Sequence, residues 1–261
     1  MFRGIWHYRN FIVGLVKRDF KDKYLNSVLG FVWAILHPLT TILVYTLIFS
    51  QVMQAKLSGI GDPIAYSIYL CSGIITWQLF SEVLTRTQNV FLEQASLLKK
   101  VNFPKLTLPI YIVLTTAINF LILIVLFIVF LVITGRAPDL SITSLIPLLL
   151  IQQAFAIGIG IFLGTINVFF RDIGHGMSIV LQFWFWFTPI VYPSEIIPEK
   201  FNWILQLNPM MSLIQSYQDI FLFGFWPIWS DLIYASLIAL GSLALGYITF
   251  KKFVNELVDE L

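Results

Sequence analysis

The chain has 261 residues, of which 58% are hydrophobic and 11% are charged, and its formal net charge is +2. Its mean hydropathy is +0.86. A composition this apolar excludes an ordinary water-soluble globular protein and is typical of a helical bundle in lipid. The small net charge gives no reason to expect a nucleic-acid partner.

Six long apolar runs free of Asp, Glu, Lys and Arg dominate the sequence. Each can cross a hydrocarbon core about 30 Å thick as a helix, and none shows the strict alternation of a barrel strand. We therefore expect an all-α integral membrane protein with six transmembrane helices in a single domain, residues 1–261. The runs lie between Lys23 and Lys56, Asp62 and Glu82, Lys105 and Arg136, Asp139 and Arg171, Asp172 and Glu195, and Asp231 and Lys251.

The positive charges are distributed unevenly among the breaks. Thirteen of the sixteen Lys and Arg residues lie before the first run, after the second and fourth runs, or after the sixth. Because positive residues are retained in cytoplasmic segments, this pattern predicts that both termini are cytoplasmic.

Residues 1–24 precede the first run and show a helical, two-sided pattern. We expect an amphipathic helix in the cytoplasmic headgroup layer, in contact with membrane lipid; a simple topology anchor is the alternative. One side is polar, with Arg3, His7, Asn10, Lys17, Arg18 and Lys21. The other side is apolar, with Ile5, Tyr8, Ile12, Leu15, Val16 and Phe20.

The break between the second and third runs, residues 84–109, is predicted to be the longest cytoplasmic loop. Residues 91–100 have good helix propensity, and Pro104 and Pro109 bracket the entry to the third span. A short cytoplasmic helix of this kind can transmit motion to a soluble partner. A purely structural loop remains the alternative.

The last extracytoplasmic break, residues 193–230, contains an uncharged stretch that polar residues interrupt. We expect two short helices, at about 195–207 and 210–223, with a hinge at Asn208-Pro209. They would form a re-entrant or interfacial lid at the periplasmic end of a pathway.

Five consecutive aromatic residues, 183–187, lie ahead of this lid. Counted along a helix from Gly174, they fall about 14–20 Å into the bilayer, which is deeper than an interfacial aromatic belt. Aromatic faces suit the C–H faces of sugar rings. The predicted pathway residues are Trp184, Trp186, Phe187 and Tyr192. Since Trp184 and Trp186 lie about 200° apart on a helix, one is expected to face the lumen and the other to be packed.

Sequence motifs for chemistry are scarce. There is no G-x-x-x-x-G-K-[ST] phosphate loop, so ATP hydrolysis by that route is excluded and energy must come from elsewhere. The histidines are separated by span lengths, which predicts no metal site; they are His7, His37 and His175.

Ionisable residues at mid-membrane positions are almost absent, which disfavours proton-coupled transport. Glu82 and Arg86, at i, i+4 spacing near the cytoplasmic end of the second run, are expected to pair. The single Cys71 lies inside this run and is expected to be a small apolar core residue.

Several segments, taken in order along nearly the whole chain, resemble the permease subunits of ABC transporters that export O-antigen, capsule or teichoic acid. The first is Arg18-Asp19-Phe20-Lys21-Asp22-Lys23-Tyr24, with Ser27, Leu29-Gly30, Trp33 and Pro38. The second is Leu97-Leu98-Lys99-Lys100-Val101-Asn102-Phe103-Pro104, with Leu108-Pro109. The others are Arg171-Asp172-Ile173, Thr188-Pro189-Ile190 with Tyr192-Pro193, and Leu207-Asn208-Pro209-Met210 followed by Tyr217.

The resemblance implies six spans, an N-terminal interface helix, a cytoplasmic coupling helix and two short helices before the last span. It also implies a homodimer that works with two copies of a separate nucleotide-binding subunit, which would bind the ATP and magnesium. This chain would bind no cofactor and catalyse no reaction itself. The pathway would run between the two permeases, lined mainly by the first and fifth spans.

With this resemblance, the sequence is interpreted as a bacterial inner-membrane permease that moves an undecaprenyl-pyrophosphate-linked polysaccharide from cytoplasm to periplasm. Expected contacts to the ATPase subunit are Glu93, Leu97, Leu98 and Lys99, and expected contacts to the pyrophosphate are Arg18, Lys21 and Lys23. An ABC exporter of lipids or drugs is one alternative. An intramembrane glycosyl- or acyltransferase is another, although no recognised motif joins its outward acidic candidates, Asp62, Glu195, Glu199, Asp219 and Asp231.

Overall fold

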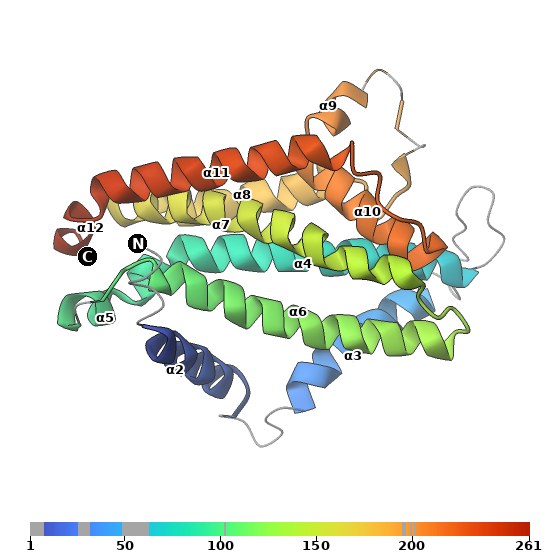
Figure 1. Cartoon of the computed structure of the whole chain (residues 1–261), viewed down its shortest axis with the longest axis horizontal. Coiled ribbons are helices and arrows are strands. Elements are labelled where there is room, and N and C mark those ends of the chain that lie inside the picture. The colour runs from blue at the N-terminus through green and yellow to red at the C-terminus, as the bar shows by residue number, and fades with distance from the viewer. Residues whose placement is uncertain are drawn as a thin grey trace.

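The structure is a computed structural model that describes residues 8–25, 32–48, 63–101, 103–194, 197, 198, 200 and 202–261. Every regular element among these residues is helical (Figure 1). In chain order they are α2 (Arg9–Phe20), the π-helix η1 (Lys21–Leu25), α3 (Val32–Thr46), α4 (Pro63–Glu93), α5 (Ala95–Lys100), α6 (Thr107–Ile133), the 3-10 helix η3 (Leu140–Ser144), α7 (Leu145–Phe169), α8 (Asp172–Phe187), α9 (Asn202–Gln206), α10 (Pro209–Phe223), α11 (Leu232–Phe253) and α12 (Glu256–Asp259).

Four of the described helices are long and apolar enough to cross a bilayer: 64–93, 107–133, 140–169 and 232–253. They match the second, third, fourth and sixth predicted spans. The described helices in the first and fifth predicted spans, α3 and α8, have 15 and 16 residues. A helix of 16 residues is about 24 Å long, which is less than the hydrocarbon thickness, so these two spans stay predictions.

Helix α4 lies at the centre of the bundle and packs against α6, α7, α8 and α10 (Figure 1). Most residues in its apolar stretch are buried, whereas most of those in the apolar stretches of α6 and α11 are exposed or only partly buried. The predicted core residue Cys71 is indeed buried on α4. An outer surface of aliphatic side chains on peripheral helices is what a bundle in lipid requires.

Close helix contacts in this bundle depend on small residues. Gly160 and Gly164 of α7 face α4 at Thr87 and Gln88, and Gly158 of α7 faces α11. An added Cβ at any of the three would approach these neighbours to within 3.0 Å. Small residues bring helix backbones together in lipid, where packing rather than hydrophobic burial drives association.

Helix α4 does not end where the sequence suggested. It continues to Glu93, so the first ten residues of the segment predicted as the loop 84–109 are helical. The predicted helix 91–100 is divided by a turn at Gln94, after which α5 begins. The charged pair Glu82 and Arg86 lies within α4, and both side chains have ionic partners there.

The predicted break at Asn208-Pro209 is present between α9 and α10. Pro209 occupies the first turn of α10, where its missing N–H is not needed, and the Asn208 side chain accepts a hydrogen bond from the Met210 N–H at 3.1 Å. Gly224, at φ 68°, ends α10 in the left-handed conformation. The predictions for Arg3, Ile5, His7, Asp62, Glu195 and Glu199, and for the side chain of His37, lie outside the described residues.

Candidate functional site

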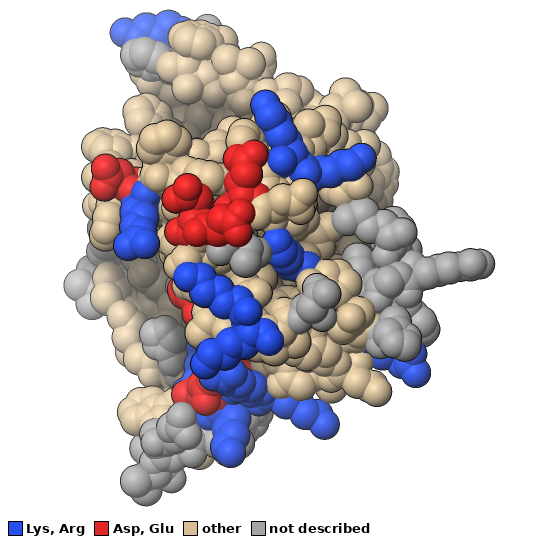
Figure 2. All heavy atoms as spheres, turned by 90° about the vertical axis from the view of Figure 1, so that its left-hand side faces the viewer, with Lys and Arg blue, Asp and Glu red and all other residues tan. Residues whose placement is uncertain are grey.

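Charged side chains gather at the end of the bundle that carries α5 and α12 (Figure 2). Lys99 and Lys100 of α5 and Lys251 and Lys252 of α11 are all exposed there. The N-terminal helix α2 lies beside this end and packs against α6. Three predicted elements, the interface helix, the coupling helix and the C-terminus, are therefore neighbours in space.

Helix α2 turns its apolar side toward the protein. Ile12 is buried, and Tyr8, Phe11, Leu15 and Val16 pack around the same cluster as residues of α4, α6 and α7. In the described part of the helix, the residues predicted on its polar side are exposed and those predicted on its apolar side are buried or partly buried, while its place in the headgroup layer stays a prediction. Its apolar side binds the bundle itself, whereas Val13 on another side is 48% exposed.

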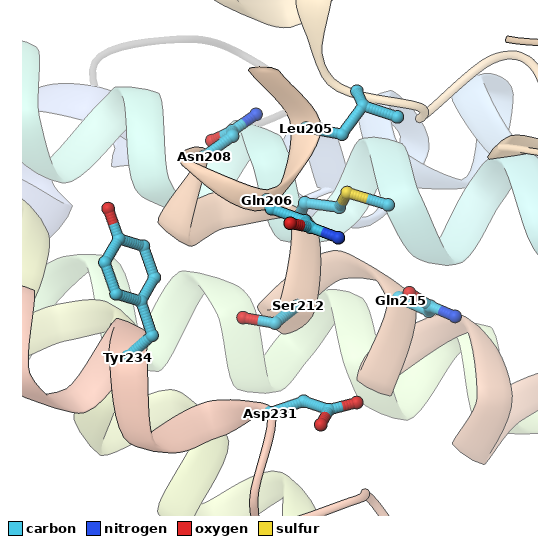
Figure 3. A pocket seen from close by; sticks show the side chains of 8 residues that line it. Leu205, Gln206, Asn208, Ser212, Gln215, Asp231 and Tyr234 are labelled. Carbon is cyan, nitrogen blue, oxygen red and sulfur yellow. The ribbon is translucent and has the colours of Figure 1, made fainter. Parts of the chain in front are cut away.

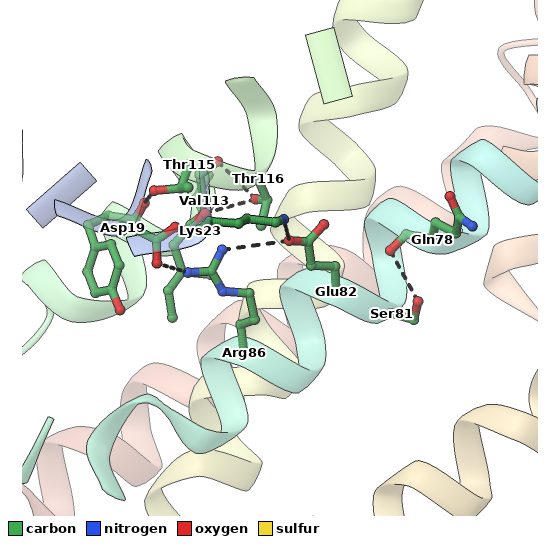
Figure 4. A network of polar contacts seen from close by, with 11 residues as sticks. Asp19, Lys23, Gln78, Ser81, Glu82, Arg86, Val113, Thr115 and Thr116 are labelled. Atoms are coloured by element: carbon green, nitrogen blue, oxygen red, sulfur yellow. Dashed lines mark hydrogen bonds and ion pairs between the residues drawn. The ribbon is translucent and has the colours of Figure 1, made fainter. Parts of the chain in front are cut away.

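An ionic network connects the end of α2 to α4 (Figure 4). The Arg86 guanidinium lies 2.5 Å from Asp19 and 3.6 Å from Glu82, and Lys23 lies 3.5 Å from the same Glu82 oxygen. The Glu82–Arg86 pair predicted from spacing is therefore confirmed. Asp19 and Lys23 were missed as partners, because nothing local relates them to residues about 60 positions away.

The three predicted pyrophosphate-binding cations differ in exposure and in their ionic partners. Arg18 forms an i, i+4 pair with Asp22 at 3.6 Å, with both side chains largely exposed. Lys21 is exposed. Lys23 is engaged by Glu82, so an anion would have to displace that carboxylate to bind it.

The predicted ATPase contacts divide into two groups. Glu93 and Lys99 are exposed and Leu97 is partly exposed, so these side chains can reach a partner. Leu98 is 7% exposed and belongs to the core cluster that includes Phe91, Phe103 and Phe250. Leu98 is thus already buried within this chain.

A cationic recess lies beside α5. Its volume is about 420 Å³, and Lys99, Lys100 and Lys105 line it together with Phe103 and Asn255. Lys105 donates a hydrogen bond to the Val254 carbonyl, which ties the segment after α5 to the end of α11. Partial burial lowers the pKa of Lys105, and the nearby Asp259 opposes that shift.

The aromatic segment 183–187, at the C-terminal end of α8, has one packed and one exposed tryptophan. The Trp184 ring contacts Trp77, Phe80 and Phe155 at centroid distances of 5.3–6.0 Å. Trp186 is 57% exposed, and Phe183 and Phe187 are similarly exposed. The geometry thus separates the two tryptophans as their spacing predicted, while the lumenal role of Trp186 stays a prediction.

Polar side chains fasten the end of α8 to the lid helices. The Trp184 indole N–H donates to Asn208 Oδ1 at 2.9 Å, and Asn208 Nδ2 donates to Thr188 Oγ1 at 2.8 Å. One asparagine therefore caps α10, holds Trp184 and fixes the residue that follows α8. Asn208 was predicted only as a hinge.

Two tyrosines of α4 hold the non-helical segment after α8. Tyr69 Oη lies 3.1 Å from the Pro189 carbonyl and 3.2 Å from the Tyr192 carbonyl, and Tyr66 donates to the Val191 carbonyl. The Tyr192 hydroxyl in turn donates to the Trp186 carbonyl at 2.5 Å. Tyr192 is therefore partly buried and oriented by backbone contacts.

Comparison with known proteins identifies the family. The sequence profile described as ABC-2 type transporter matches residues 11–222. The chain belongs to the ABC-2 type transporter family. This match extends from the interior of α2 to α10, so it includes the ionic network and the aromatic segment described above, whereas α11 and α12 lie beyond it.

Similar proteins are named as export or transport proteins. The ABC-2 chain is 36% identical to an O-antigen export system permease protein RfbA of Klebsiella pneumoniae, over 82% of this chain and 80% of the relative. It is 34% identical to the protein of the same name from Myxococcus xanthus, over 84% and 83%. It is 22% identical to the polysialic acid transport protein KpsM of Escherichia coli, over 92% of each.

Proposed function

We propose that this chain is the permease subunit of an ATP-driven exporter that moves an undecaprenyl-pyrophosphate-linked polysaccharide from the cytoplasm to the periplasm across the bacterial inner membrane. The similarity to O-antigen export permeases, over more than four-fifths of the chain, carries this proposal. The four long apolar helices fit a membrane subunit. The concentration of exposed lysines at the α5 end supports placing that end, and both termini, in the cytoplasm.

The proposed assembly contains two copies of this chain and two copies of a nucleotide-binding subunit, which supplies the ATP and magnesium sites. The exposed apolar faces of α3 and α8 support homodimerisation along the first and fifth spans. Their exposed large side chains include Trp33, Leu36, Leu43, Ile179, Phe183 and Trp186. A glycan pathway between two such faces would be lined by Trp186, Phe187 and Tyr192, with Trp184 supporting it from behind.

The lipid carrier's pyrophosphate is proposed to bind near the end of α2. Arg18 and Lys21 are exposed there and carry the side chains suited to phosphate oxygens. Lys23 would join them by exchanging Glu82 for phosphate, which would also loosen the ionic network. Substrate binding at the membrane surface would thereby be linked to the position of α4.

The function is tested by deleting the gene for this chain. We expect the undecaprenyl-linked polysaccharide to accumulate in the cytoplasm and to disappear from the cell surface, with both effects reversed by the wild-type chain. Extraction of lipid-linked glycans and surface immunostaining measure the two pools. Unchanged surface polysaccharide in the deletion strain would contradict the proposal.

Coupling to the ATPase is proposed to occur through the exposed side of α5. Leu97→Asp should reduce copurification of the ATPase about 10-fold, because a partly exposed apolar anchor of this kind is typically worth about 1–3 kcal/mol at an interface. The measurement is affinity purification of the tagged permease followed by quantification of the bound subunit.

The neighbouring Leu98 provides the contrast for this experiment. Because Leu98 is buried in the permease core, Leu98→Asp should lower the amount of permease itself. Full recovery of the ATPase with Leu97→Asp, at normal permease abundance, would remove α5 from the docking surface.

A further inference from the structure

A polar cavity of about 320 Å³ lies where α9 and α10 meet the start of α11 (Figure 3). Asp231 and Tyr234, at the start of α11, form one wall, and Ser212 and Gln215 of α10 form another. Gln206 and Asn208, at the end of α9 and the hinge after it, complete the polar lining. Neither the predicted pathway nor the coupling surface includes this cavity.

Several of these groups keep hydrogen-bonding capacity for a ligand. Gln206, Gln215 and Asp231 have exposed side chains. The Asp231 carboxylate receives one bond, from the Ser230 hydroxyl at 3.2 Å, and a carboxylate can accept several. Asn208 has a different role, because its amide is already bonded to Trp184, Thr188 and Met210.

The cavity also contains an aromatic ring held in a defined position. The Tyr234 hydroxyl donates to the Leu207 carbonyl at 3.1 Å, which links α11 to the segment between α9 and α10. The Tyr234 side chain is nevertheless 39% exposed. An aromatic face beside carboxamide, hydroxyl and carboxylate groups can contact the C–H face of a sugar ring while these groups bind its hydroxyls.

The chemistry of the lining discriminates between classes of ligand. Among the residues that the structure describes, the lining contains one carboxylate and neither Lys nor Arg, so a phosphate or another anion would meet repulsion without compensation. An apolar chain would leave the amides and the carboxylate without partners. A neutral molecule with many hydroxyls satisfies both constraints, and the volume lies at the small end of ligand pockets.

We propose that this cavity binds a short, uncharged stretch of the exported glycan at the outer end of the permease. This inference rests on the proposed export function. The contacts are few and open to solvent, so binding is weak and rapidly reversible, as a polymer in transit requires. Because the cavity walls come from α9, α10 and α11, an occupied cavity would also link the lid helices to the last span.

The test uses the full-length permease purified with its ATPase subunit, and polysaccharide released from its lipid carrier by mild acid. The variant Asp231→Asn together with Gln215→Leu should weaken binding at least 10-fold, as measured by isothermal titration calorimetry. Glu260→Gln, which removes an exposed carboxylate on the C-terminal side of α12, should bind as the wild type does. Sodium pyrophosphate should not compete.

A second variant, Asp231→Asn alone, is nearly isosteric and is used in case the double variant folds poorly. It should weaken binding several-fold at an unchanged melting temperature. Equal binding by the wild type and both variants, or competition by pyrophosphate, would overturn the assignment. The deletion experiment separates the two proposals. If surface polysaccharide is lost on deletion but the variants bind normally, only the cavity assignment fails.

Discussion

Gly246→Ala in α11 is expected to remove most of the folded permease from the membrane. A Cβ at this position would lie 2.4 Å from the carbonyl oxygen of Gly158 in α7. The obstructing atom is backbone, so no side-chain rotation can relieve the contact and the two helices must separate. Overpacking of this kind typically costs about 1–3 kcal/mol, which exceeds the gain of about 1 kcal/mol from replacing glycine by alanine in a helix.

Gly241 of the same helix provides the matched control. An added Cβ there meets nothing within 4 Å, so Gly241→Ala should keep normal abundance and the same or a slightly higher melting temperature. Both quantities are measured with a fluorescent fusion, by membrane fluorescence and by size-exclusion chromatography after heating. Equal stability of the two variants would show that α7 and α11 are not packed as closely as the structure has them.

Trp184→Ala and Trp186→Ala are expected to fail in different ways. Trp184 loses contacts with three core aromatic rings and its hydrogen bond to Asn208, and truncating a core aromatic residue typically costs about 3–5 kcal/mol. The abundance of the Trp184→Ala permease in the membrane should therefore fall. Trp186 is exposed, and the bond it accepts from Tyr192 uses its backbone carbonyl, which alanine retains. Trp186→Ala should keep normal abundance and reduce export.

Membrane immunoblots and surface-polysaccharide staining, performed on the same cells, measure these two effects. Normalising export to abundance separates a pathway defect from a folding defect. If both variants export normally at normal abundance, the aromatic residues belong to an interfacial belt. If Trp186→Ala alone is depleted, its ring is buried against another subunit rather than directed into a lumen.

The helical class, the positions of four long apolar helices and the hinge of the lid follow from local rules. Run length sets which segments can cross a bilayer. Proline in the first turn with asparagine before it sets where α10 begins, and i, i+4 spacing brings Glu82 to Arg86. These features depend on residues that are close together in the chain, so the sequence can be read for them without the tertiary structure.

The tertiary structure alone decided which partners distant residues meet. The 200° between Trp184 and Trp186 is a property of one helix, but which of them faces inward depends on where Trp77 and Phe155 lie. Glu82 and Arg86 also meet Lys23 and Asp19, which lie about 60 residues earlier in the chain. The polar cavity likewise combines α9, α10 and α11, since burial and ion pairing are determined by long-range packing that helical periodicity does not specify.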